Sequence, residues 1–244
     1  MRSKASETLT YAKVAYYNQT KLEEYLSSCG GRLIEFINNS NTDTQGYVAE
    51  IGGEIMIGFR GTEILNPGDW KIDLDRKMVH DPMTGGKIHR GFDMAFSSVI
   101  VQLMDSIGES QAISIRLYGH SLGAAIAVQA AYFLVQAENR NVTHIGLVGC
   151  PKIGDALFAA QYNKALYEAT HNYVNCCDVV PRVPFWNHPI GQIQYIDSDR
   201  SLHREPSSLF KFYDRVKGRI EHGWRVPSRG ISDHFTSSYE EAMR

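Results

Sequence analysis

A serine held between two glycines is the group in this sequence whose setting best suits chemistry. Residues 119–123 read Gly-His-Ser-Leu-Gly, a G-x-S-x-G pattern that exposes its serine on a sharp turn between a strand and a helix. A serine hydroxyl becomes an effective nucleophile when a neighbouring base removes its proton. Apolar residues alternate before the turn and an alanine-rich run follows it, as a strand and a closely packed helix require. We therefore predict that Ser121 is a nucleophile.

A serine nucleophile needs a histidine base, and the histidine needs a carboxylate that fixes its tautomer. In sheets that carry such a turn the chain order is Ser, Asp, His. Asp178 directly follows the apolar run "YVNCC", which favours it over three other aspartates: Asp155, Asp197 and Asp199. Four histidines come later in the chain: His188, His203, His222 and His234. His203 and His222 lie among charged residues and read as surface groups. His234 is favoured because it begins the last helical segment, and His188 stays open as the alternative.

The elements around these residues predict an α/β fold. Residues 47–51 and 54–59 read as a hairpin, and residues 92–108 have apolar positions at helical spacing. Short apolar runs at 143–151 and 172–184 resemble buried parallel strands, and a weaker alternating strand covers 190–197. Strands that alternate with helices indicate a mainly parallel sheet with helices on both faces. Chemistry gathers at the carboxyl ends of such strands, where Ser121 and Asp178 are expected.

Composition narrows the class of protein further. The chain has 244 residues, 43% of them hydrophobic, and a formal net charge of −2, so we expect one domain over 1–244 and no nucleic-acid partner. The four cysteines show no C-x-x-C spacing, which argues against a zinc site or a disulfide framework. Charges interrupt the apolar positions of residues 1–26, unlike a signal peptide. A cytoplasmic location is therefore the default expectation, with a secreted form left open. The oligomeric state is not predicted.

Six short blocks stand in the order found in one known family. They are "FRGT" (59–62), "HRGF" (89–92), "GHSLGA" (119–124), "GCPKIGD" (149–155), "DVVPRVP" (178–184) and "DHFTSSY" (233–239). In this order they resemble the class 3, fungal lipase-like α/β-hydrolases, and the resemblance covers about residues 46–240. It implies the α/β-hydrolase fold and a catalytic triad of Ser121, Asp178 and His234.

The resemblance also implies the groups around the triad. The backbone N–H of Leu122, and the N–H and hydroxyl of Thr62, would form the oxyanion hole that stabilises the tetrahedral intermediate. The stretch "GDWKID" (68–73) is similar to the family's lid motif, which places a lid at about 63–82 with Trp70 in it and lets Asp73 support the Thr62 hydroxyl. Val183 and Phe185 follow Asp178 closely and are expected either in the substrate pocket or in the core.

The expected activity is hydrolysis of acylglycerols or related lipid esters through an acyl-enzyme, with no metal and no organic cofactor. A phospholipase, a galactolipase, a feruloyl-type esterase and a non-catalytic lipase-like binding module remain alternatives. Residues 207–225 form a basic amphipathic stripe. The stripe predicts either packing on the protein's own core or a transient contact with a lipid interface, and core packing is favoured.

Overall fold

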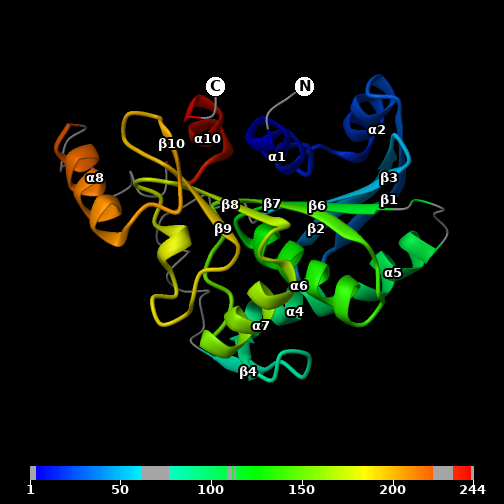
Figure 1. Cartoon of the computed structure of the whole chain (residues 1–244). Helices are drawn as coiled ribbons and strands as arrows, with labels where there is room; N and C mark the ends of the chain where they lie inside the picture. Colours follow the sequence, from blue (N-terminus) through cyan, green and yellow to red (C-terminus); the bar gives the residue numbers. More distant parts are fainter. Residues whose placement is uncertain (1–3, 62–76, 109–111, 113, 222–232, 243–244) are drawn as a thin grey trace.

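An eight-stranded sheet forms the centre of the computed structural model, which describes residues 4–61, 77–108, 112, 114–221 and 233–242 (Figure 1). The strand order is β1-β2-β3-β6-β7-β8-β9-β10. Their bounds are β1 Gly31–Asn39, β2 Thr44–Ile51, β3 Glu54–Phe59, β6 Ser114–His120, β7 Val142–Val148, β8 Thr170–Asn175, β9 Gln192–Ile196 and β10 Leu202–Arg204. Strands β3, β6, β7, β8 and β9 run parallel, and antiparallel partners flank them on both sides. A separate hairpin pairs β4 Met78–His80 with β5 Lys87–His89.

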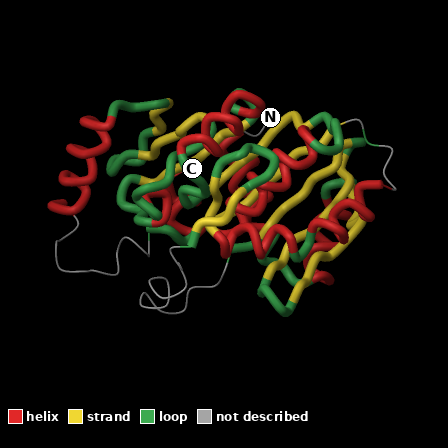
Figure 2. Tube along the Cα trace, turned by 90° about the horizontal axis from the view of Figure 1, so that it is seen from below, coloured by secondary structure: helices red, strands yellow, loops and turns green. Residues whose placement is uncertain are grey.

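Helices cover both faces of the sheet, as the sequence predicted. On one face lie α1 Lys4–Val14, α2 Gln19–Ser28 and α10 Thr236–Ala242; on the other lie α4 Arg90–Ser97, α5 Ile100–Gly108, α6 Leu122–Gln136 and α7 Ala156–Leu166 (Figure 1). Helix α8 Ser208–Glu221 lies at the outer end of the molecule beyond β10, at the left in Figures 1 and 2. The predicted α/β fold with a mainly parallel sheet is confirmed.

The predicted helix over 92–108 is wrong in one respect, because the structure divides it into α4 and α5 at Ser98 and Val99. The side chain of Asn39 donates to the Ser98 carbonyl at 2.9 Å, and the Ser98 hydroxyl bonds to Thr42 at 2.7 Å and to the Ala95 carbonyl at 2.8 Å. These bonds to the β1–β2 turn compete with the helical pattern and interrupt it. Strand β1, which supplies Asn39, was not predicted.

The core lies on both sides of the sheet. Helix α6 is buried along nearly its whole length against β3, β6 and β7, and its alanines permit the close approach. On the opposite face, α1 packs so tightly that a side chain at Gly146 of β7 would collide with Thr8. Among the residues described, no helix combines the length and the apolar content needed to cross a bilayer.

Candidate active site

Ser121 occupies the turn between β6 and α6 with φ 57° and ψ −126°. Few non-glycine residues adopt such backbone angles, which cost about 1–3 kcal/mol and persist only where the surroundings hold them. The turn is held by hydrogen bonds from Ser121 N to the Val148 carbonyl at 3.0 Å and from Ala124 N to the Ser121 carbonyl at 3.0 Å. The side chain is 2% exposed. This is the strained elbow that the G-x-S-x-G pattern predicts.

The two glycines of the pattern are required by close backbone contacts. A methyl group on Gly119 would overlap the backbone of Gly123, and one on Gly123 would overlap the Phe59 carbonyl at the end of β3. The first turn of α6 can therefore lie directly against the ends of two strands. Leu122 opens α6, and the first amides of a helix have no acceptor within the helix.

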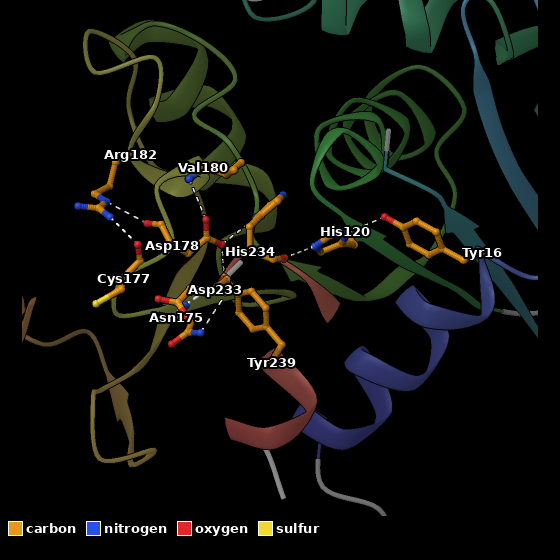
Figure 3. Close-up of polar contacts among 10 residues, drawn as sticks. All are labelled: Tyr16, His120, Asn175, Cys177, Asp178, Val180, Arg182, Asp233, His234 and Tyr239. Carbon is orange, nitrogen blue, oxygen red and sulfur yellow. Dashed lines mark hydrogen bonds and ion pairs between the residues drawn. The ribbon is translucent and has the colours of Figure 1, made fainter. Parts of the chain in front are cut away.

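Asp178 and His234 form a buried hydrogen-bonded pair (Figure 3). Asp178 follows β8, and His234 lies in the turn before α10. His234 Nδ1 lies 2.8 Å from Asp178 Oδ2, and the two side chains are 3% and 0% exposed. Because the carboxylate only accepts hydrogen bonds, Nδ1 carries the proton and Nε2 is the basic nitrogen.

Three neighbours hold the Asp178 carboxylate and its loop in place (Figure 3). The Tyr239 hydroxyl donates to Oδ2 at 2.7 Å, and Val180 N donates to Oδ1 at 2.8 Å. Arg182 donates to the carbonyls of Cys177 and Asp178, both at 2.9 Å. The carboxylate is therefore a fixed acceptor rather than a mobile one.

The imidazole of His234 packs on two residues next to the elbow, Gly149 and His120. A methyl group on Gly149 would be 2.7 Å from His234 Cε1 and 2.8 Å from Nδ1, and Gly149 directly follows Val148, whose carbonyl binds Ser121 N. His120, the residue before the serine, stacks on the His234 ring with a centroid distance of 4.6 Å. The structure thus brings the predicted serine, aspartate and histidine to one place at the carboxyl ends of β6, β7 and β8.

A second chain of hydrogen bonds connects His234 to Tyr16, a residue near the N-terminus. The carbonyl of His234 accepts from His120 Nε2 at 2.7 Å, so Nε2 carries the proton and Nδ1 accepts from the Tyr16 hydroxyl at 2.7 Å (Figure 3). The Tyr16 oxygen in turn accepts from Gly61 N at 3.2 Å. Burial, and then the neighbouring His234, lower the pKa of His120 to about 3, so the ring stays neutral in this network.

Sequence reasoning missed three of these supporting residues: Tyr16, His120 and Tyr239. His120 and Tyr239 stand inside motifs that the sequence singled out, but nothing in their spacing indicated a role. Tyr16 lies 104 positions before His120, and only the folded chain brings it to the elbow.

The structure describes only some of the remaining predicted site residues. Thr62, Trp70 and Asp73 lie outside the described residues, as does most of the candidate lid; within its described part, Met78–His80 form β4. Gly61, which precedes Thr62, packs against the elbow, since a methyl group on it would be 2.8 Å from Ser121 Cβ. Val183 is half-buried, whereas Phe185 is 76% exposed, so the core alternative is wrong for Phe185.

The alternative partners of Ser121 have other structural positions. Asp155 accepts from Phe158 N at 2.9 Å and caps α7. Asp197 accepts from His203 at 2.6 Å, and Asp199 pairs with Lys217. His188 joins an isolated bridge with Gly154, and His222 lies outside the described residues. Within the described chain, no cluster of three or more His, Cys, Asp or Glu side chains could hold a metal ion.

Comparisons with known proteins agree with this geometry. The family model described as lipase (class 3) matches residues 56–188. A secreted mono- and diacylglycerol lipase of Malassezia globosa is 26% identical over 197 residues, which cover 74% of this chain and 62% of that protein. A lipase of Rhizomucor miehei is 30% identical over 152 residues, covering 58% of this chain and 41% of that protein. The chain therefore spans less than two thirds of the length of these curated relatives.

A solved structure shares the fold. Lipase II from Rhizopus niveus superposes with a TM-score of 0.67 and 25% identity, and the match covers 79% of this chain and 80% of that one.

Proposed function

Because this chain belongs to the class 3 lipase family, we propose that it is a serine carboxylester hydrolase that cleaves acylglycerols. The buried Asp178–His234 pair beside the strained Ser121 elbow carries this proposal. The names of the Malassezia and Rhizomucor relatives support a lipid ester as the substrate.

The proposed reaction assigns one role to each member of the triad. His234 Nε2 takes the proton of Ser121 as Oγ attacks the ester carbonyl carbon. The imidazolium, stabilised by Asp178, then gives this proton to the departing alcohol oxygen as its bond to the acyl carbon breaks. Water, deprotonated by the same nitrogen, attacks the acyl-enzyme and releases the acid and the free serine.

The oxyanion hole is proposed from two backbone positions. The N–H of Leu122, in the first turn of α6, is one donor, and Thr62 is the other. Gly61 packs against Ser121 Cβ, which supports a donor from the next residue. Trp70 and Asp73 in the lid, and Val183 and Phe185 near Asp178, remain proposed substrate contacts.

The test of the proposed function is labelling by a fluorophosphonate probe together with hydrolysis of p-nitrophenyl esters. Ser121→Ala should lose labelling and lower kcat/KM by at least about 10⁴-fold, because the triad acts as a unit. Ser106→Ala is the matched control: its serine is also buried, but its hydroxyl donates to the Gln102 carbonyl within α5. Equal labelling of both variants, or no labelling of the parent chain, would favour a non-catalytic lipid-binding module.

Rates on emulsified mono-, di- and triacylglycerols, compared with phosphatidylcholine, a galactolipid and a feruloyl ester, would separate the remaining substrate classes. A jump in rate when an ester exceeds its solubility would indicate a lipase that works at an interface. We further propose that residues 1–244 act as one catalytic domain. The name of the secreted Malassezia relative favours export over the cytoplasmic expectation, and fractionation of the producing cells would test it.

A further inference from the structure

Helix α8 is amphipathic, and it turns its polar side toward the protein. The helix begins after Ser207, whose side chain accepts from Phe210 N at 3.1 Å. On its inner side, Asp214 is 8% exposed and accepts from Tyr195 Oη at 2.8 Å, Ser198 N at 3.0 Å and Ser198 Oγ at 2.7 Å. The charged Asp214 therefore anchors the helix to β9 and the loop that follows it, and the Phe210 ring adds contacts to Tyr195 and His203 at centroid distances of 6.3 and 4.8 Å.

The inner side approaches the active-site loop closely at Gly218. A methyl group on Gly218 would lie 3.2 Å from Ser198 Cβ, 3.3 Å from Cys177 Sγ and 3.7 Å from Cys176 Sγ. Cys177 directly precedes Asp178. Helix α8 therefore packs on the segment that carries the proposed catalytic carboxylate.

The apolar side of α8 faces solvent. Four large side chains that recur at helical spacing are exposed: Leu209 by 63%, Phe212 by 55%, Tyr213 by 64% and Ile220 by 61%. A surface helix normally buries such a stripe against its own protein. The core packing favoured from the sequence is therefore wrong for Leu209, Phe212 and Ile220, whereas Val216 between them is half-buried. A contiguous exposed apolar face of this kind marks a site of interaction.

Basic side chains border this apolar face. The helix contains four basic residues, Lys211, Arg215, Lys217 and Arg219, and two acidic residues. The Asp214 carboxylate points inward, whereas Arg219 and Lys217, the latter paired with Asp199, are exposed on the two flanks of the stripe. An apolar stripe with a cationic border suits a helix that lies in the headgroup region of an anionic bilayer, since long basic side chains reach the headgroups while the apolar ones enter the acyl layer.

We propose that the exposed face of α8, formed by Leu209, Phe212, Tyr213 and Ile220 with Lys217 and Arg219 beside them, docks the protein on an anionic lipid surface. Helix α8 lies at the outer end of the molecule (Figures 1 and 2), and the apolar side chains of this face are more than half exposed. Its packing on the Cys176–Cys177 segment holds the docked surface in a fixed relation to Asp178. The proposal rests on the proposed function for the reason to bind lipid, and its test is independent of catalysis.

The test is co-sedimentation of the full chain with vesicles of phosphatidylcholine alone and with about 30 mol% phosphatidylglycerol. Every chain in this vesicle assay also carries Ser121→Ala, which is expected to prevent lipid turnover. The triple variant Leu209→Gln, Phe212→Gln, Ile220→Gln should lower the partition coefficient on anionic vesicles at least about tenfold, because each apolar side chain contributes through its burial. A double variant at exposed apolar residues of α4 and α5, Met94→Gln with Val101→Gln, is the control and should bind like the parent.

Charge is tested separately. Arg219→Glu should weaken binding to the anionic vesicles several-fold and leave binding to phosphatidylcholine unchanged. Lys164→Glu, exposed on α7, makes the same change in net charge and should have no such effect.

The proposal is overturned if the triple variant binds anionic vesicles as well as its parent, or if the parent does not bind them. Loss of a dimer in the triple variant, measured by sedimentation equilibrium, would overturn it in favour of self-association. Hydrolysis of a soluble p-nitrophenyl ester, measured on chains that keep Ser121, distinguishes failure of the lipid-docking proposal from failure of the proposed hydrolase function. The triple variant should retain this rate, whereas a parent chain inactive on that ester contradicts the proposed function and leaves the vesicle result standing.

Discussion

The hydroxyl of Tyr239 donates to Asp178 Oδ2 at 2.7 Å, the same carboxylate oxygen that lies 2.8 Å from His234 Nδ1. Tyr239 also accepts from Asn175 N at 3.0 Å and is fully buried. A residue of α10 thus ties the end of β8 to the carboxylate that is proposed to orient the base. Burial, and then the Asp178 charge, raise the pKa of this tyrosine, so it remains a donor throughout the working range of pH.

Tyr239→Phe should lower kcat on a soluble ester by about 10- to 100-fold, because Asp178 loses a hydrogen bond that holds it in position. The free energy of unfolding should fall by about 1–3 kcal/mol, since the Asn175 N–H loses its acceptor. Tyr162→Phe is the matched control: it is equally buried and bonds to Thr170 Oγ1 at 2.9 Å, away from the site. It should lose stability but keep kcat. Equal losses of kcat in the two variants would contradict a positioning role for Tyr239.

Gly149→Ala should reduce kcat by about 100-fold, because the added methyl group would lie 2.7 Å from His234 Cε1 and would displace the ring. Gly149 has φ +60° and Gly52 has φ +61°, but the space around Gly52 is open. Gly52→Ala therefore reproduces the backbone strain, roughly 1–2 kcal/mol, without the collision. Denaturant unfolding should show similar losses of stability from strain, while the rate should fall only in Gly149→Ala. An active Gly149→Ala enzyme would mean that the imidazole lies elsewhere.

Tyr16→Phe should lower kcat by about tenfold with little change in KM, since the hydroxyl links Gly61 to His120 and, through it, to the His234 carbonyl. The pKa of His120 is lowered to about 3, so the size of this effect should stay constant between pH 5 and pH 9. Tyr17→Phe removes a neighbouring hydroxyl whose ring packs on Tyr25 instead, and it should behave like the parent. A Tyr16 effect that varies strongly over this pH range would show that His120 titrates.

Acid should destabilise the fold through buried histidines. Burial, and then Arg116 and His171, lower the pKa of His144 from 6.5 to about 3. The unfolded chain takes up this proton below about pH 6.5 and the folded chain does not until about pH 3, so stability is lost as pH falls through that window. His144→Gln should reduce the slope of unfolding free energy against pH by up to about 1.4 kcal/mol per pH unit within it. Denaturant titrations at pH 4, 5 and 8 measure the slope, and identical slopes at pH 4–5 would contradict the prediction.

Local sequence signals were sufficient for the elbow and for the parallel strands. The glycines around Ser121 and the apolar runs before Asp178 reflect close packing over a few residues, which a sequence displays directly. Helix α4 was predicted too long because the bond from Asn39 to the Ser98 carbonyl joins residues 59 positions apart. Strand β1 has a mixed burial pattern without clean alternation, so periodicity alone gave little signal.

The contacts that support the site join residues that are even farther apart in the sequence. Tyr16 meets His120 only because α1 crosses the sheet face opposite α6 (Figure 1). The outward orientation of α8 was also hidden, because a hydrophobic stripe has the same spacing whichever way it faces. Asp214 decides the orientation by bonding to Tyr195 and Ser198.

The order in which the site is completed follows from the position of its base. His234 and Tyr239 come 56 and 61 residues after Asp178, later than every strand of the central sheet. A nascent chain that has emerged from the ribosome as far as α8 contains Ser121 and Asp178, the proposed nucleophile and carboxylate, but not His234, the proposed base. On the proposed mechanism such a chain would lack its general base, and ester hydrolysis would begin only when the turn before α10 docks.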